Sequence, residues 1–179
     1  MPALYCGLQR SGGHEDDAFC KGKPDQARMS RNVLLVEDDD NDVFFFRRAM
    51  KLAGCCSPLQ VVNDGRQAID YLSGQGQFSR RDEFPIPSLV LLDLKLPYLN
   101  GLEVLKWIRE HATMRQLAVV MLTSSKEDVD IEQACTLGAN AYVVKPASAD
   151  ALQELVASIW SFWMKHNQFC PGFTAVSVK

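Results

Sequence analysis

The chain alternates between short apolar runs and segments in which apolar residues recur every three or four positions. The five apolar runs are VLLV (33–36), LQVV (59–62), SLVLL (88–92), LAVVML (117–122) and AYVV (141–144). Runs of this length are typical of strands that are buried on both faces. The pattern therefore predicts five strands that belong to the interior of a sheet.

A segment with helical spacing follows each apolar run. The predicted helices cover 41–53, 65–73, about 100–111, about 126–137, and a last segment whose apolar stripe runs from Leu152 to Trp163. Asp39 or Asp40 is expected to cap the first of these helices, and Ser148 the last. Because strands and helices alternate five times, the sequence predicts an α/β fold with a parallel sheet between two layers of helices.

The segment 74–87, GQGQFSRRDEFPIP, separates the second helix from the third strand. Its composition predicts a long polar loop, which the connectivity places at the amino ends of the strands. Ligands of open α/β sheets bind at the carboxyl ends. We therefore expect no site in this loop, although it contains Arg80 and Arg81.

The alternating pattern covers residues 31–165, which we interpret as one folded domain. Residues 1–30 show no sustained period and are expected to be a flexible extension. Residues 166–179 form a short tail in which no effector domain is expected. Trp163 is expected in the core, whereas Trp160 or Phe162, together with Phe169 and Phe173 of the tail, are candidates for contact with a partner.

Composition excludes several classes of protein. No apolar run is long enough to span a membrane, and the amino-terminal residues do not resemble a secretion signal, so we expect a cytoplasmic protein. A net charge of −3 and a pI near 5.6 argue against a nucleic-acid-binding domain. The six cysteines include no CxxC pair, so a zinc site is not expected.

Reactive side chains follow the predicted strands where each strand ends. The acidic run EDDDND (37–42) follows the first strand, Asp93 the third, Thr123 the fourth and Lys145 the fifth. Carboxylates from neighbouring strand ends favour a hard divalent cation, with Mg²⁺ the best fit. A cation, a lysine and a hydroxyl together form a receptor for a phosphoryl group, and a carboxylate among them can be the nucleophile.

Four motifs in order carry a resemblance to a known family. They are VLLVEDD (33–39), LLDLKLPYLNG (91–101), MLTSS (121–125) and AYVVKP (141–146). With these motifs the chain from about 31 to 165 resembles a response-regulator receiver domain of two-component signalling, of the stand-alone CheY-like type. The resemblance implies a doubly wound, flavodoxin-like (βα)5 fold with strand order 2-1-3-4-5.

The resemblance also implies an acceptor and a metal site. Asp93 would accept the phosphoryl group. Glu37, Asp38 and Asp93, with the backbone carbonyl of Lys95, would hold Mg²⁺. A register with Asp38 and Asp39 as the acidic pair is less favourable, because it would leave Glu37 within the strand.

Two further residues would sense the phosphoryl group. Thr123 and Lys145 would bind its oxygens, and Tyr142 would turn inward when Thr123 moves. The bond between Lys145 and Pro146 would be cis.

In this reading the chain is a signalling domain rather than an enzyme, with Mg²⁺-dependent self-phosphorylation and autodephosphorylation as its only reactions. The implied partners are a sensor histidine kinase or a histidine phosphotransfer protein, a downstream protein on the face of the fourth helix, fifth strand and fifth helix, and a second copy of the chain. Nucleic acid and membrane are not expected as partners. The alternative is a binding module of the same fold that works without phosphorylation. A dehalogenase-type hydrolase is disfavoured because Lys95 stands where that family needs a second aspartate.

Overall fold

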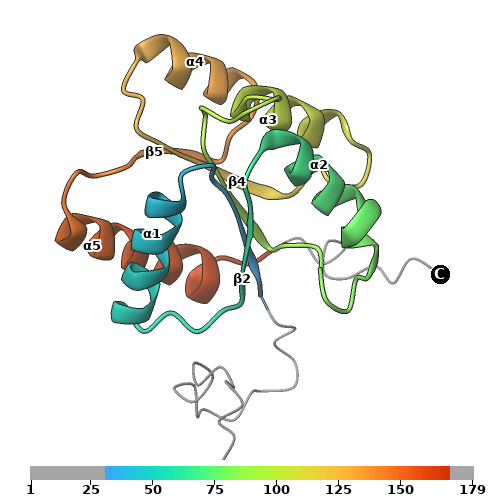
Figure 1. Ribbon diagram of the computed structural model, residues 1–179. Coiled ribbons are helices and arrows are strands. Elements are labelled where there is room, and N and C mark those ends of the chain that lie inside the picture. Colours follow the sequence, from blue (N-terminus) through green and yellow to red (C-terminus); the bar gives the residue numbers. More distant parts are fainter. Residues whose placement is uncertain (1–30, 170–179) are drawn as a thin grey trace, which may run out of the picture.

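Five parallel strands in the order β2-β1-β3-β4-β5 form the centre of the computed structural model, which describes residues 31–169 (Figure 1). The strands are β1 (Val33–Val36), β2 (Leu59–Val62), β3 (Leu89–Leu92), β4 (Ala118–Thr123) and β5 (Ala141–Val144). The helices are α1 (Asp40–Leu52), α2 (Gly65–Ser73), α3 (Gly101–Glu110), α4 (Asp128–Thr136) and α5 (Ala149–Trp160). The predicted α/β fold and strand order are confirmed.

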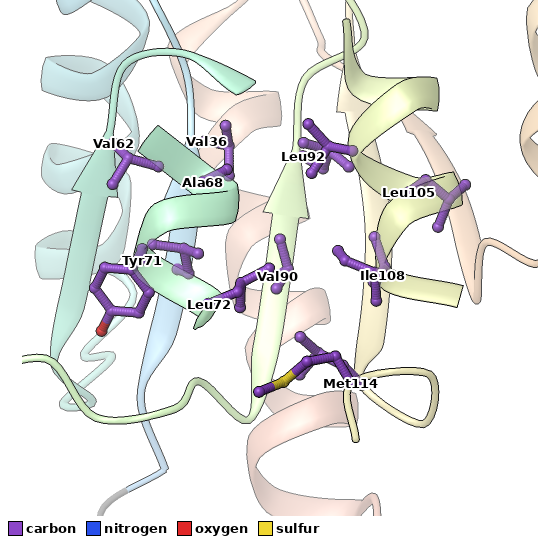
Figure 2. Close-up of a cluster of buried hydrophobic side chains, with 14 of the residues drawn as sticks. Val36, Val62, Ala68, Tyr71, Leu72, Val90, Leu92, Leu105, Ile108 and Met114 are labelled. Carbon is purple, nitrogen blue, oxygen red and sulfur yellow. The ribbon is translucent and has the colours of Figure 1, made fainter. Parts of the chain in front are cut away.

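The sheet separates two hydrophobic cores, because successive residues of a strand point to opposite faces. In β1, Leu34 and Val36 face the core under α2, α3 and α4, whereas Val33 and Leu35 face the core under α1 and α5. Figure 2 shows the first core, in which side chains of the strands meet those of α2 and α3. All four β1 residues are buried, which explains why the strand is apolar without alternation.

Most element boundaries agree with the predicted ranges. β1, β2, β5 and α2 match at both ends, and α4 is shorter than the predicted 126–137. The predicted caps are present, since the Asp39 carboxylate accepts the Asn41 N–H and the Ser148 side chain accepts the Ala151 N–H.

The segment 74–87 is not the open polar loop that its composition predicts. It contains a short 3₁₀ helix, η1 (Gly76–Ser79), whose Phe78 is buried against Tyr71. The Arg81 guanidinium donates to the carbonyls of Tyr71 (2.7 Å), Leu72 (2.7 Å) and Phe84 (3.1 Å). The bonds to Tyr71 and Leu72 satisfy carbonyls at the end of α2, and they tie the segment to that helix.

The chain continues beyond α5 in a π-helical segment, η2 (Ser161–His166). Trp160 and Trp163 both pack against the core under α1 and α5, whereas Phe162 is exposed. Phe169 also packs against this core, and the Arg31 guanidinium lies 5.2 Å from its ring centroid. Phe173 and residues 1–30 lie outside the described residues.

Within residues 31–169, the helices are all too short or too polar to pass through a lipid bilayer.

Candidate functional site

Reactive side chains from four strand ends meet at the carboxyl edge of the sheet. Glu37 follows β1, Asp93 follows β3, Thr123 ends β4 and Lys145 follows β5. Glu37, Asp93 and Thr123 are all buried. The edge lies where strand order reverses between β1 and β3, which is where open α/β sheets bind ligands.

The Lys145 ammonium is the centre of the site. It donates to Glu37 Oε2 at 2.5 Å, to Asp42 Oδ2 at 2.8 Å and to Asp93 Oδ2 at 2.8 Å. The lysine side chain is only 14% exposed. A buried ammonium needs such partners, because an unpaired charge is costly away from water.

Asp93 is held through both carboxylate oxygens. Oδ2 accepts from Lys145, and Oδ1 accepts the backbone N–H groups of Leu94 (2.5 Å) and Lys95 (3.3 Å). The backbone of Asp93 also lies against Gly101 at the start of α3, where an added Cβ would be 2.1 Å from the Asp93 carbonyl oxygen. The Asp93 carboxylate is therefore fixed in orientation by its neighbours.

Three acids form a group that fits a divalent cation. One carboxylate oxygen each from Glu37, Asp38 and Asp93 can be chosen so that all three lie within 4.8 Å of one another. Asp39 is not in this group, because its carboxylate caps α1. An all-oxygen set with one exposed member suits a hard cation that keeps some of its water, such as Mg²⁺ or Mn²⁺.

Burial and charge shift two protonation equilibria at the site. Burial raises the pKa of Glu37 to about 7, against an opposing contribution from Lys145. Burial acts to lower the pKa of Lys145, but its bonds to Asp42, Asp93 and Glu37 outweigh this, so the pKa lies above the ordinary value. Near neutral pH the metal-free site therefore keeps its lysine charged and holds a proton on part of its Glu37.

A second network surrounds Thr123. The Thr123 hydroxyl accepts the Ser125 N–H at 3.3 Å, and the Tyr142 hydroxyl donates to the Ser125 carbonyl at 3.3 Å. The Ser125 hydroxyl donates to Asp130 of α4 at 2.5 Å. Ser125 thus connects the predicted switch residues to α4.

The sequence reasoning gave Asp42 no role at the site, and it did not predict the contacts that Ser125 makes. Asp42 lies in the first turn of α1, and only the acidic run 37–42 could have pointed to it. Ser125 follows Thr123 by two positions, and its bond to Asp130 has no signal in the sequence. The predicted cis bond before Pro146 is wrong, since the described residues contain no cis peptide. Trans is the preferred isomer before proline, and Lys145 reaches all three acids with it.

A cavity of about 780 Å³ adjoins the site between α1 and the start of α5. Asp42, Phe45, Ser124 and Lys126 are among the residues that line it, together with Lys145. The site is therefore open to solvent on the side of α1.

Comparison with known proteins gives one consistent family. The family model for the "Response regulator receiver domain" matches residues 33–157. The response regulator Rcp1 of Synechocystis sp. is 32% identical, over 79% of this chain and 94% of its own length.

Solved structures agree with this match. The response regulator RPA3017, in red light signalling of R. palustris, has a TM-score of 0.75 and 36% identity, with 78% of this chain and 98% of the other covered. The phosphorylated cyanobacterial phytochrome response regulator RcpA has a TM-score of 0.73 and 30% identity, with 79% and 99% covered. A Mn²⁺-bound form of response regulator Rcp1 has a TM-score of 0.71 and 31% identity, with 78% and 99% covered.

Proposed function

The chain belongs to the response-regulator receiver domain family of two-component signalling, and on that basis we propose that Asp93 accepts a phosphoryl group from a phosphohistidine. The observation that carries this proposal is the state of the Asp93 carboxylate, which is buried, held by Lys145 and accompanied by two further acids. Such an arrangement has no use in stability alone, because each buried acid costs desolvation. It is suited to a reaction in which negative charge arrives and must be balanced.

The transfer replaces one phosphorus bond by another. A carboxylate oxygen of Asp93 bonds to phosphorus while the bond from phosphorus to the donor imidazole nitrogen breaks, and its electron pair returns to the ring. The N–H groups of Leu94 and Lys95 keep the carboxylate oriented, which lowers the entropy cost of the attack. Lys145 then pairs with the oxygens of the new group.

The proposed cofactor is Mg²⁺, with Glu37, Asp38, Asp93 and the backbone carbonyl of Lys95 as its ligands. When bound, it supplies positive charge that offsets the charge on the phosphoryl oxygens. The three-acid group and the Mn²⁺-bound form of Rcp1 support this choice.

Phosphorylation would change the network around Thr123. The Thr123 hydroxyl, which now accepts the Ser125 N–H, would turn its own O–H toward a phosphoryl oxygen and move with it. We expect Tyr142 to follow, which breaks its bond to the Ser125 carbonyl and alters the face of α4, β5 and α5. A downstream protein or a second copy of the chain would bind this face.

The proposed phosphodonor is a sensor histidine kinase or a histidine phosphotransfer protein in the cytoplasm. RPA3017 is described in red light signalling and RcpA as a phytochrome response regulator. These two relatives make a phytochrome-type kinase the first donor to test.

The experiment is phosphorylation by acetyl phosphate with Mg²⁺, followed by intact mass, beside an Asp93→Asn variant. One added phosphoryl group is expected in the natural protein, and none in the variant or without Mg²⁺. If no group is added, titration with beryllofluoride separates two outcomes. A response would mean that the site needs its own kinase, and no response by a folded protein would favour a binding module that works without phosphorylation.

A further inference from the structure

The Lys145 ammonium has no hydrogen-bond donor to spare. A lysine ammonium carries three N–H donors and no acceptor. The three are given to Glu37, Asp42 and Asp93. A phosphoryl oxygen can therefore receive an unshared N–H of Lys145 only if one of these carboxylates gives up its bond.

The three carboxylates differ in how easily they can leave. The Glu37 and Asp93 side chains are 3% and 8% exposed, whereas the Asp42 side chain is 44% exposed. Glu37 and Asp93 are also members of the three-acid group, and Asp42 is not. Releasing a carboxylate that is already half in water costs far less than stranding a buried one.

We propose that Asp42 is the releasable counter-ion of Lys145. Before phosphorylation, Asp42 positions the Lys145 ammonium beside Asp93. When the phosphoryl group arrives, the bond from Lys145 to Asp42 breaks, and the freed N–H donates to a phosphoryl oxygen. The cavity of about 780 Å³ that Asp42 lines gives its carboxylate room and water to move into. This inference rests on the proposed function, and it assigns a role in the reaction to a helix residue outside the strand ends.

Asp42 acts in this scheme through Lys145 and is a positioning residue. It competes with the phosphoryl group for a donor, and its own charge repels the incoming negative charge. Asp42→Asn should therefore improve the binding of a phosphoryl analogue, although it removes an ion pair. A residue that only supports the fold would not have this effect.

The test is isothermal titration of beryllofluoride into the full chain at fixed Mg²⁺. Asp42→Asn should bind about fivefold more tightly than the natural protein, because both competition and repulsion are reduced. Asp40→Asn is the matched control, since Asp40 is exposed in the same first turn of α1 and its loss changes the net charge equally. The affinity of the Asp40→Asn variant for beryllofluoride should equal that of the natural protein. The Asp42→Glu variant keeps the carboxylate, so its affinity should lie closer to the natural value than that of Asp42→Asn.

Two results would overturn the inference alone. If the natural protein binds beryllofluoride and Asp42→Asn matches Asp40→Asn, Asp42 is not a competitor for Lys145. If Asp42→Asn binds more weakly, its carboxylate supports the occupied site and does not yield to it. If the natural protein neither binds beryllofluoride nor gains a phosphoryl group, the proposed function fails, and this inference fails with it.

Discussion

At the scale of single residues, Glu37 couples the site to pH. Its pKa of about 7 lies above the ordinary 4.5, so the folded, metal-free protein holds a proton that the unfolded chain releases. The metal-free protein therefore loses stability as pH rises from about 5 through about 7. A bound cation needs the carboxylate form, so it counteracts this loss.

We predict that the apparent affinity for Mn²⁺ is about tenfold lower at pH 6 than at pH 8, because a pKa near 7 leaves most of Glu37 protonated at the lower value. Calorimetric titration at both pH values measures this. Glu37→Gln should bind Mn²⁺ more weakly and with little dependence on pH. An equal dependence in that variant would assign the titration to another group.

Gly101 is a second residue whose identity is fixed by its surroundings. We predict that Gly101→Ala lowers the free energy of unfolding by roughly 2 kcal/mol or more, because a Cβ there overlaps the backbone of Asp93. Urea denaturation measures the loss. Gly54→Ala is the comparison, since Gly54 has a positive φ of 66° but nothing near its Cβ position. If both variants lose a similar free energy of unfolding, the cause is the conformational freedom of glycine and not an overlap with Asp93.

At the scale of elements, the segment 74–87 shows what the hydrophobic pattern missed. The strands and most helices were predictable because burial on one or two faces leaves a period in the sequence. The 3₁₀ helix η1 is too short to show a period, and a single arginine holds the segment by bonds to carbonyls. Contacts of this kind depend on tertiary position, which composition does not record.

We predict that Arg81→Ala destabilises the protein by about 2–3 kcal/mol, because it leaves three carbonyls without their charged donor. The neighbouring Arg80→Ala is the control. Arg80 pairs with Asp82 and Glu83 at an exposed position, so its loss should cost less than about 0.5 kcal/mol. Thermal unfolding of both variants measures the difference. Equal shifts in Tm would show that the bonds of Arg81 to the three carbonyls do not stabilise the protein more than the exposed ion pairs of Arg80 do.

At the scale of the whole molecule, the site joins segments that are far apart in the chain. Asp93 and Lys145 could be predicted, since strand ends converge by the topology of a parallel sheet. Asp42 could not, because a helix residue reaches the site only through the packing of α1 against the sheet. The hydrophobic pattern also did not predict the trans bond before Pro146. The prediction of a cis bond came from the family resemblance alone.

We predict that Lys145→Ala lowers the free energy of unfolding by roughly 3 kcal/mol in EDTA at pH 8, because it leaves acids clustered without a cation. Millimolar Mg²⁺ should recover a larger part of the loss than it adds to the natural protein. Lys106→Ala, which removes an exposed lysine 3.9 Å from Glu110, should change little in either buffer. If Mg²⁺ stabilises all three proteins equally, Lys145 and the cation do not share the same acids.

The division into two cores has a consequence for how the molecule is organised. Thr123 follows Leu122 of the α1–α5 core in an alternating strand, so it lies on the other side of the sheet, where Tyr142 also packs. Asp42 and the cavity belong to the α1 side. The sheet thus separates the two halves of the proposed mechanism, with Asp93 at its edge: Asp42, the proposed counter-ion, lies on one side, and Thr123 and Tyr142, the proposed switch residues, lie on the other.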